Sequence, residues 1–322
     1  MSSIMTNAAA MTALQSLQLT TRNIERVQGR ISTGYEVANA SDNAAYWSIA
    51  TTMRSDNSAL ATVQDALGLG AAKVDVTYTA LEKALNVVDE IKTKLVAAAE
   101  PGVDKTKINK EITALKEQLQ SITTSASFSG ENWLHNTDTA VAGTKSVVGS
   151  FTRDSAGLVT VETLDIDVTT LTLTATDDAQ WGILTKDIDA DALLATPTGT
   201  AASYFLLDVG STTAATGTEI AIDNTTPDAD IEAMIRVTDN IISQLTDAAS
   251  DLGATKKRID MQSEFVDSLM DAIERGIGQL VDADMSREST RLQALQVQQQ
   301  LGIQALSIAN SNAQTILALF QN

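Results

Sequence analysis

The feature that constrains this chain most is an apolar stripe of helical period that runs from Ile49 to Leu95. Residues spaced alternately by three and four positions lie on one face of an α-helix. Ser41 and Asp42 are suited to cap the start of such a helix, and Pro101-Gly102 ends it. A helix over residues 42–100 would be about 85 to 90 Å long at 1.5 Å per residue, and it needs other helices to cover its stripe. The stripe comprises Ile49, Met53, Asp56, Leu60, Val63, Leu67, Gly70, Val74, Thr77, Leu81, Ala84, Val88, Ile91 and Leu95.

Four further stretches carry the same period. A first helix ends at Ser32-Thr33-Gly34, where Gly suits a left-handed cap, and a third helix opens at Asp104 and returns antiparallel along the second. The third stripe is Ile108, Ile112, Leu115, Leu119 and Ile122. Towards the C-terminus, Leu245, Leu252, Ile259, Val266, Ile273 and Leu280 are each seven apart, and a last helix follows them. Sustained heptads of this kind favour supercoiled helix packing.

The central part of the chain has a different character. About 21 Thr fall between residues 137 and 230, and the apolar period changes from 3.6 to 2. Strands are predicted within residues 158–175, 202–209 and 219–222, with a bulge or turn in the first of these. The predicted fold is therefore mainly α: a long antiparallel helical bundle or coiled coil formed by the N- and C-terminal regions, with a β-rich (α+β) solvent-facing central insert.

The charges are distributed unevenly along the chain. The formal net charge is −19, and residues 139–230 hold 14 acids and three bases, so the insert carries −11 of it. Residues 1–21 and 292–322 have no ionisable side chain. A polar but charge-free helix face is poorly suited to a soluble monomer and well suited to being covered by copies of the same chain. The predicted interface residues are Ala10, Leu14, Leu17, Ile24 and Ile31 in the first helix, and Leu292, Leu295, Gly302, Leu306, Ala309, Ala313, Ile316 and Phe320 in the last.

Composition excludes several classes of function. A chain this acidic offers no basic patch for nucleic acid or an anionic membrane, and no window reaches the apolar length of a membrane span. With no Cys and one His, the sequence holds no thiolate or multi-histidine metal centre. Asp187, Asp189 and Asp191 imitate the start of a calcium loop, but Ala192 and Thr198 replace its Gly and Glu. No catalytic, cofactor or metal site is predicted, and His135 is assigned to local packing.

Motifs at both ends resemble one family. Residues 31–34 (Ile-Ser-Thr-Gly) and 39–45 (Asn-Ala-Ser-Asp-Asn-Ala-Ala) are similar to the N-terminal signature of the bacterial flagellins, and residues 252–258 resemble their C-terminal Leu-Gly-Ala-x-x-x-Arg. The similarity covers about residues 1–136 and 232–322, in the family's order. The signature residues are Ser32, Gly34, Asn39, Ser41, Asp42, Ala44, Ala45, Leu252, Gly253 and Arg258.

The resemblance implies a structural subunit that polymerises into the flagellar filament, with no catalysis. It implies a terminal coiled-coil domain (1–41 with 285–322), a bundle domain that forms the tube wall (42–138 with 231–284) and a variable outer domain (139–230). The implied partners are other copies and related flagellins, an export chaperone and the type III export apparatus, and hook-associated and cap proteins. The implied location is the extracellular filament, reached without a cleaved signal peptide.

The sequence departs from the family pattern at three places. Tyr46 stands where Gly is usual, Glu36 stands near the usual Arg, and residues 89–99 lack the Arg-Glu-Leu core associated with the innate immune flagellin receptor, so the resemblance does not extend to that binding. A hook-filament junction protein of the same superfamily and an unrelated coiled-coil surface protein are the alternative functions. An enzyme within the insert is disfavoured because the chain has no His-Glu-x-x-His.

Overall fold

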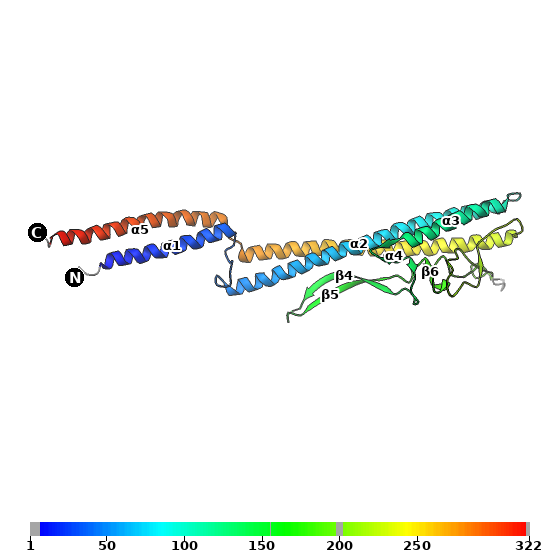
Figure 1. Cartoon of the computed structure of the whole chain (residues 1–322), viewed down its shortest axis with the longest axis horizontal. Coiled ribbons are helices and arrows are strands. Elements are labelled where there is room, and N and C mark those ends of the chain that lie inside the picture. Colours follow the sequence, from blue (N-terminus) through cyan, green and yellow to red (C-terminus); the bar gives the residue numbers. More distant parts are fainter. Residues whose placement is uncertain (1–6, 155, 198–201, 320–322) are drawn as a thin grey trace. The chain divides into compact units, whose positions relative to one another are not determined.

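The computed structural model describes residues 7–154, 156–197 and 202–319, with side chains described as far as Ser311 at the C-terminal end (Figure 1). The helices are α1 (Ala8–Thr33), α2 (Ala44–Ala98), α3 (Lys105–Ser125), α4 (Asp228–Val281) and α5 (Met285–Leu319). The strands are β1 (Ser127–Phe128), β2 (Glu131–Asn132), β3 (His135–Asn136), β4 (Thr144–Arg153), β5 (Val159–Asp167), β6 (Thr174–Ala175), β7 (Ile188–Asp189), β8 (Ser203–Phe205) and β9 (Thr218–Glu219), with a 3₁₀ turn η1 (Ala179–Trp181). The predicted mainly helical fold with a strand-containing insert is confirmed.

The chain forms two compact units. Unit 1 consists of residues 1–58 and 269–322, and unit 2 of residues 59–268. The long helices α2 and α4 are each divided between the two units, with one segment in unit 1 and one in unit 2.

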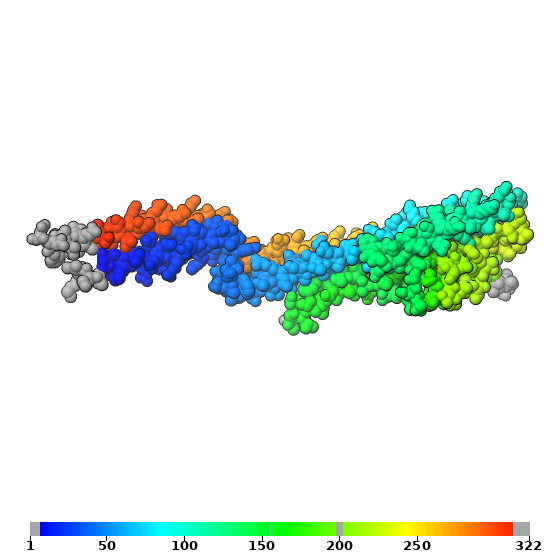
Figure 2. Space-filling model, in the orientation of Figure 1, coloured from blue at the N-terminus to red at the C-terminus, as the bar shows by residue number. Residues whose placement is uncertain are grey.

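Unit 1 holds the terminal helices α1 and α5, which lie side by side along their length (Figures 1 and 2). The Asn7 side chain caps α1 by accepting a hydrogen bond from the Ala10 N–H at 3.0 Å. At the other end Gly34 has φ 78°, and its N–H bonds to the Arg30 carbonyl. This left-handed conformation explains why the predicted stop at residues 32–34 requires Gly.

The chain segments before α2 and after α4 are joined by backbone hydrogen bonds. The Glu36 N–H donates to the Val281 carbonyl at 2.7 Å, and the Ala283 N–H donates to the Gly34 carbonyl at 2.8 Å. Beside this connection Val37, Ala50, Ile277 and Val281 form a buried apolar cluster. The two connections, α1 to α2 and α4 to α5, are therefore fixed to each other.

The start of α2 differs from the sequence expectation in two details. Asn43, rather than Ser41 or Asp42, caps the helix, because its Oδ1 accepts from the Ala45 and Tyr46 N–H groups. Asp42 instead stabilises the preceding turn by accepting from the Ala38 and Asn39 N–H groups. The prediction for Ile49 was wrong as well: it is exposed and Ala50 takes the buried position, because the cluster with Ile277 and Val281 sets the rotation of this first stretch.

In unit 2 the predicted stripe of α2 is buried from Leu60 to Leu95, and it faces the heptads of α4, of which Leu245, Leu252, Ile259 and Val266 are buried. Three polar contacts hold one antiparallel register between the helices. Gln64 contacts Asp267, Asp75 contacts Lys256, and Lys92 contacts Asp239. The apolar stripes supply the burial, and these pairs allow only one alignment of the two helices.

The insert contains shorter strands than the sequence predicted. β5 lies within the expected run 158–175, and the expected irregularity is a turn at residues 169–171. The expected strands at 202–209 and 219–222 are limited to β8 and β9. The long strand β4, which pairs antiparallel with β5 and carries a register shift between Val148 and Ser150, was not predicted. Val147 and Val148 are adjacent and lie just before this bulge. The apolar residues of β4 therefore do not alternate with polar ones, and the strand has no clear period of two.

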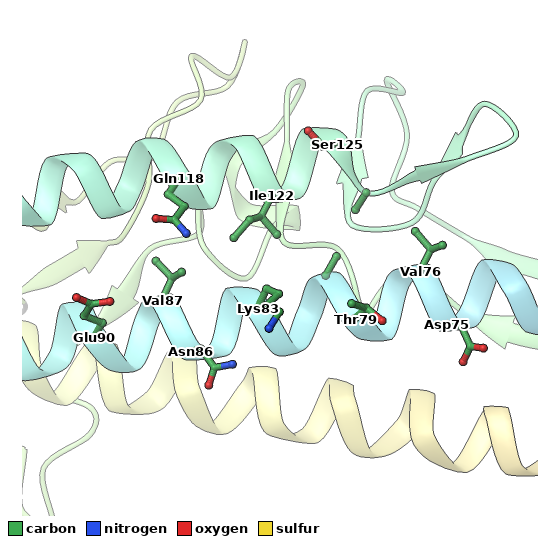
Figure 3. A pocket seen from close by; sticks show the side chains of 12 residues that line it. Asp75, Val76, Thr79, Lys83, Asn86, Val87, Glu90, Gln118, Ile122 and Ser125 are labelled. Carbon is green, nitrogen blue, oxygen red and sulfur yellow. The ribbon is translucent and has the colours of Figure 1, made fainter.

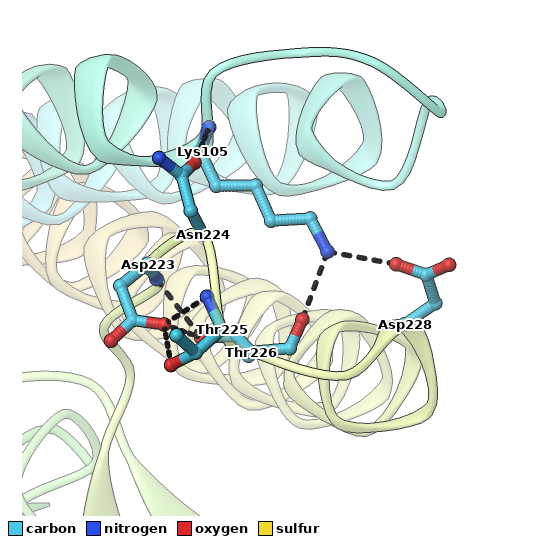
Figure 4. A network of polar contacts seen from close by, with 6 residues as sticks. All are labelled: Lys105, Asp223, Asn224, Thr225, Thr226 and Asp228. Atoms are coloured by element: carbon cyan, nitrogen blue, oxygen red, sulfur yellow. Dashed lines mark hydrogen bonds and ion pairs between the residues drawn. The ribbon is translucent and has the colours of Figure 1, made fainter.

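The last part of the insert is bound to α3. The Asn224 Oδ1 accepts from the Lys105 N–H at 3.0 Å and so caps α3, whereas the side chain of Asp104 makes no capping bond (Figure 4). Lys105 Nζ also contacts the Thr226 carbonyl and Asp228. About three turns further along α3, the buried Lys116 Nζ bonds to Glu219 at 2.8 Å. Burial lowers the pKa of Lys116, although Glu219 acts in the opposite direction.

The β4–β5 hairpin docks on α2 through a glycine. A Cβ placed on Gly70 would lie 2.3 Å from Val147 Cγ1, so only Gly allows Val147 to approach this closely. Gly68, two residues earlier on the same helix, has nothing within 4 Å of its Cβ position. Both glycines lie inside α2, but only Gly70 is in close contact with another part of the chain.

We expect Gly68→Ala to raise the free energy of unfolding by about 0.5 to 1 kcal/mol, because Ala favours the helix over Gly. Gly70→Ala gains the same propensity but overpacks against Val147, so it should be about 1 to 3 kcal/mol less stable than Gly68→Ala. Urea unfolding measures both values. Adding Val147→Ala to the Gly70→Ala variant should recover part of the difference, and equal stabilities of the two Gly→Ala variants would contradict the docking.

Candidate assembly interface

The seam between α1 and α5 is an antiparallel packing of two narrow stripes. Ile24, Val27 and Leu295 are buried in it, and Ile31 and Leu292 pack against them. Nearer the chain ends, a Cβ on Gly302 would lie 3.4 Å from Leu17, and the Asn7 side chain donates to the Ala309 carbonyl at 2.9 Å. These contacts hold one register from the Asn7 end to the Arg30 end of α1.

One ion pair lies in this seam. Arg30 Nη1 is 3.1 Å from Glu288 Oε1, and the Glu288 side chain is only 6% exposed. Its second oxygen, Oε2, is buried without a hydrogen-bond partner. Arg30 also reaches the exposed Glu36 at 3.4 Å. A buried carboxylate that depends on a single guanidinium makes the pairing of α1 with α5 sensitive to the loss of Arg30.

Outside the seam, α1 and α5 expose large apolar side chains, and the ionisable residues of the two helices are confined to residues 22–30 and 287–291. Large exposed side chains lie on both helices: Met11, Leu14, Leu19, Val297, Leu301, Ile303 and Ile308. Val297, Leu301 and Ile308 are spaced by four and seven residues, so they form a second stripe on α5 outside the seam. A helix that is apolar on two faces needs cover on both.

The predicted interface residues fall into three groups. Ile24 and Leu295 are buried in the seam, and Ala10, Leu17, Ile31, Leu292, Gly302, Leu306 and Ala309 are half-buried along it. Leu14 is exposed on the outer side of α1. The side chains of Ala313 and Ile316, and the whole of Phe320, lie outside what the structure describes. The sequence prediction did not include the outer stripe of α5. The spacing of Val297, Leu301 and Ile308 by four and seven residues could have revealed it.

The signature residues occupy turns and packing positions. Ser32 and Gly34 end α1, the Asn39 carbonyl accepts from the Asp42 N–H, and Ser41 is exposed in the same turn. Ala44 and Ala45 begin α2. On α4, Leu252 is buried in the bundle, Gly253 follows it, and Arg258 is exposed.

A groove of about 750 Å³ lies between α2 and α3 (Figure 3). Asp75 and Glu90 line it, but fifteen residues of helix separate them by about 22 Å. Two carboxylates must be much closer than this to act as an acid and base pair. Asp75 is moreover bonded to Lys256. The groove therefore holds no paired carboxylates for catalysis.

The acidic turn of the insert has a structural role. Asp187 accepts hydrogen bonds from the Thr216 N–H and hydroxyl, the Gly217 N–H and the Gln180 side chain. Burial alone would raise the pKa of Asp187, but these bonds outweigh it and lower the pKa. Within the described ranges, no three His, Asp or Glu side chains gather closely enough to bind a metal ion. His135 bonds to Thr174 at 2.8 Å, which agrees with a packing role.

A pair of terminal helices that expose large apolar residues and whose outer ends carry no charge is typical of a subunit that associates with copies of itself. No described helix is long and apolar enough to pass through a bilayer.

Comparison with known proteins gives the family. Residues 4–139 match the bacterial flagellin N-terminal helical region, and residues 235–320 match the bacterial flagellin C-terminal helical region. Flagellin C of Rhizobium meliloti (strain 1021) is 61% identical, and flagellin of Brucella melitensis biotype 1 is 44% identical, each over the whole of both chains. Flagellin A of the same Rhizobium strain is 44% identical over the whole of both chains.

The chain belongs to the bacterial flagellin family. It is a non-enzymatic structural subunit of the flagellar filament, the propeller of swimming motility, and it assembles with related flagellins.

Replacing Arg30 by Ala should weaken the α1–α5 pairing by about 2 to 3 kcal/mol, because the Glu288 carboxylate loses its partner in a buried site. Hydrogen exchange of α1 and α5 amides should become correspondingly faster. Arg26→Ala, an exposed arginine on the same helix, is the matched control. Adding Glu288→Gln to the Arg30→Ala variant should restore part of the protection, and equal exchange in both Arg→Ala variants would refute the role of the pair.

Asp187→Asn should lower the free energy of unfolding at pH 7 by about 1 to 3 kcal/mol, because a charged acceptor of several hydrogen bonds is lost. Since the folded-state pKa of Asp187 is lowered, its contribution is present above the unfolded pKa and disappears as the pH falls through the folded one. As the pH is lowered through the acid range, urea unfolding should therefore show a smaller loss of the free energy of unfolding for Asp187→Asn than for the unsubstituted chain. Asp208→Asn, whose carboxylate bonds to the Gly210 N–H in an exposed turn, should change little.

Proposed function

We propose that α1 and α5 form the inner, self-associating layer of the filament. The observation that carries this proposal is that both helices expose large apolar residues and have no ionisable side chain over residues 8–21 and 292–319. Burying these stretches against neighbouring copies removes apolar surface from water and leaves no ionised group of theirs without a partner. The predicted interface residues then act together: the seam stripe holds α1 to α5, and the outer faces contact neighbouring copies.

The other regions have distinct roles in this proposal. Residues 1–41 with 285–322 make the inner layer, residues 42–138 with 231–284 make the tube wall, and residues 139–230 face the surrounding water. The distribution of charge supports this order, because the insert carries −11 and the terminal stretches carry none. Like charges on a solvent-facing layer also keep filaments apart.

The route to the filament is the second part of the proposal. The chain is exported through the flagellar type III apparatus to the cell exterior without signal cleavage, with a chaperone on its C-terminal helix, and meets hook-associated and cap proteins at the filament ends. The absence of Cys suits passage of an unfolded chain, since no disulfide can form before export. The uncharged apolar surface of α5 supports a need for a chaperone.

Purified chain at raised salt should form tubular filaments by electron microscopy. Leu306→Asp should abolish them and leave the circular dichroism of unit 2 intact, because an uncompensated charge would enter a covered helix face at a cost of several kcal/mol. Leu158→Asp makes the same chemical change at an exposed insert position and should assemble normally. If Leu306→Asp formed normal filaments, the proposal that the terminal helices form the interface would be wrong.

A further inference from the structure

A cavity, which we name the α4 cavity, lies between the insert and α4. Its volume is about 450 Å³, and small-molecule sites usually have roughly 300 to 1,000 Å³. The insert lines it with Trp181 and Lys186, and α4 lines it with Asp247 and Asp251. All residues that line the cavity belong to unit 2. It is therefore complete within one unit and needs no neighbouring copy.

The polar groups of these side chains are not used by the fold. Among the described residues, nothing forms a hydrogen bond or ion pair with the Trp181 indole N–H, the Lys186 ammonium, or the carboxylates of Asp247 and Asp251. Asp187, next to Lys186 in sequence, accepts hydrogen bonds from the Thr216, Gly217 and Gln180 groups already described. Donors and acceptors without protein partners thus converge on one cavity, which is typical of a small-molecule site.

The insert wall of the cavity is a tight turn held by main-chain bonds. The Lys186 N–H donates to the Gly182 carbonyl at 2.9 Å, and the Leu184 N–H donates to the Leu173 carbonyl at 2.9 Å. A Cβ on Gly182 would lie 2.7 Å from the Leu173 carbonyl oxygen, so this close approach requires Gly. The turn fixes the backbone from which Trp181 and Lys186 project, and a pre-formed wall lowers the cost of binding.

The α4 wall presents two like charges on one face. Asp247 and Asp251 are exposed and four residues apart, so their side chains are neighbours on the helix. Like charges at this spacing destabilise a helix. Ala248 and Leu252, which follow them directly, are buried, so the rotation of α4 keeps both carboxylates at the cavity. Helix stability therefore gives no reason for this pair of acids.

The charges and the aromatic ring together select the class of ligand. The two carboxylates repel an anionic ligand, and Lys186 repels a cationic one. A neutral ligand rich in hydroxyls meets neither cost, because each hydroxyl can donate to a carboxylate and accept from an ammonium or indole N–H. The half-buried Trp181 adds an apolar ring face beside these polar groups. A pyranose sugar matches both features, since it carries hydroxyls at its edge and C–H groups on its faces.

We propose that the α4 cavity binds one sugar unit of a saccharide. The Trp181 ring packs against the C–H face of the sugar, the carboxylates of Asp247 and Asp251 accept from its hydroxyls, and Lys186 donates to a further hydroxyl. Saccharide binding is then a function of the insert in addition to its place in the filament. It uses no residue of the terminal helices, so it does not depend on assembly.

Titration of the unassembled full chain with the methyl glycosides of glucose, galactose, mannose and N-acetylglucosamine tests the site. Saturation-transfer NMR reports binding of each probe, and the indole N–H signals of the three Trp residues report its position. At least one glycoside should bind with a Kd roughly in the millimolar range, as a small neutral ligand with few contacts does, and should shift the Trp181 signal. Trp181→Ala should weaken binding at least about tenfold and Asp251→Asn at least about threefold, with unchanged circular dichroism.

The matched controls are Trp47→Ala and Asp271→Asn, which change exposed residues of the same types outside the cavity and should leave the affinity unchanged. If Trp181→Ala does not fold, Asp251→Asn and Lys186→Gln carry the test, because neither side chain is buried. The proposal is overturned if no glycoside saturates, or if the cavity variants bind as tightly as the unsubstituted chain. Binding of arginine amide without binding of any glycoside would assign the two carboxylates to a cationic ligand and would equally overturn it.

Discussion

Burial of apolar stripes that lie hundreds of residues apart in sequence is the interaction on which the whole structure depends. Neither α1 nor the long α2 can cover its own stripe, and each finds its partner in the last third of the chain, in α5 and α4. An isolated helix of this kind is marginal in water, so its stability comes from packing. The fold therefore cannot be completed until both ends of the chain are present, and the insert must return the chain to the side of α3.

Polar groups decide how these apolar surfaces align. Apolar stripes alone would tolerate shifts by one heptad, whereas Asp75 with Lys256 in the bundle and Arg30 with Glu288 in the seam each allow one alignment. Asn224 serves the same purpose at the start of α3, where the insert itself supplies the helix cap. The insert is thus part of the bundle at its final segment, although it carries −11 of the net charge of the chain.

The sequence predicts well what depends on local period and poorly what depends on distant partners. All five helices and the buried run from Leu60 to Leu95 follow from spacing alone. Ile49 was misplaced because a tertiary cluster sets the rotation of α2 at its start. The role of Asp187 could not be predicted, since its donors Thr216 and Gly217 lie about thirty residues away. The use of each stripe between copies stays a prediction for the same reason.

The joint between residues 34–36 and 281–283 is made by main-chain groups. Every residue except proline offers the same N–H and carbonyl, so these hydrogen bonds do not restrict the side chains of Glu36 and Ala283. Gly34 and Val281 are restricted for other reasons, the left-handed φ of Gly34 and the burial of Val281. Glu36 illustrates the point, because it stands near a usual Arg while its N–H still bonds to Val281. Mutation of Glu36 can therefore change the side chain exposed to neighbouring copies while the backbone hydrogen bonds of the joint remain.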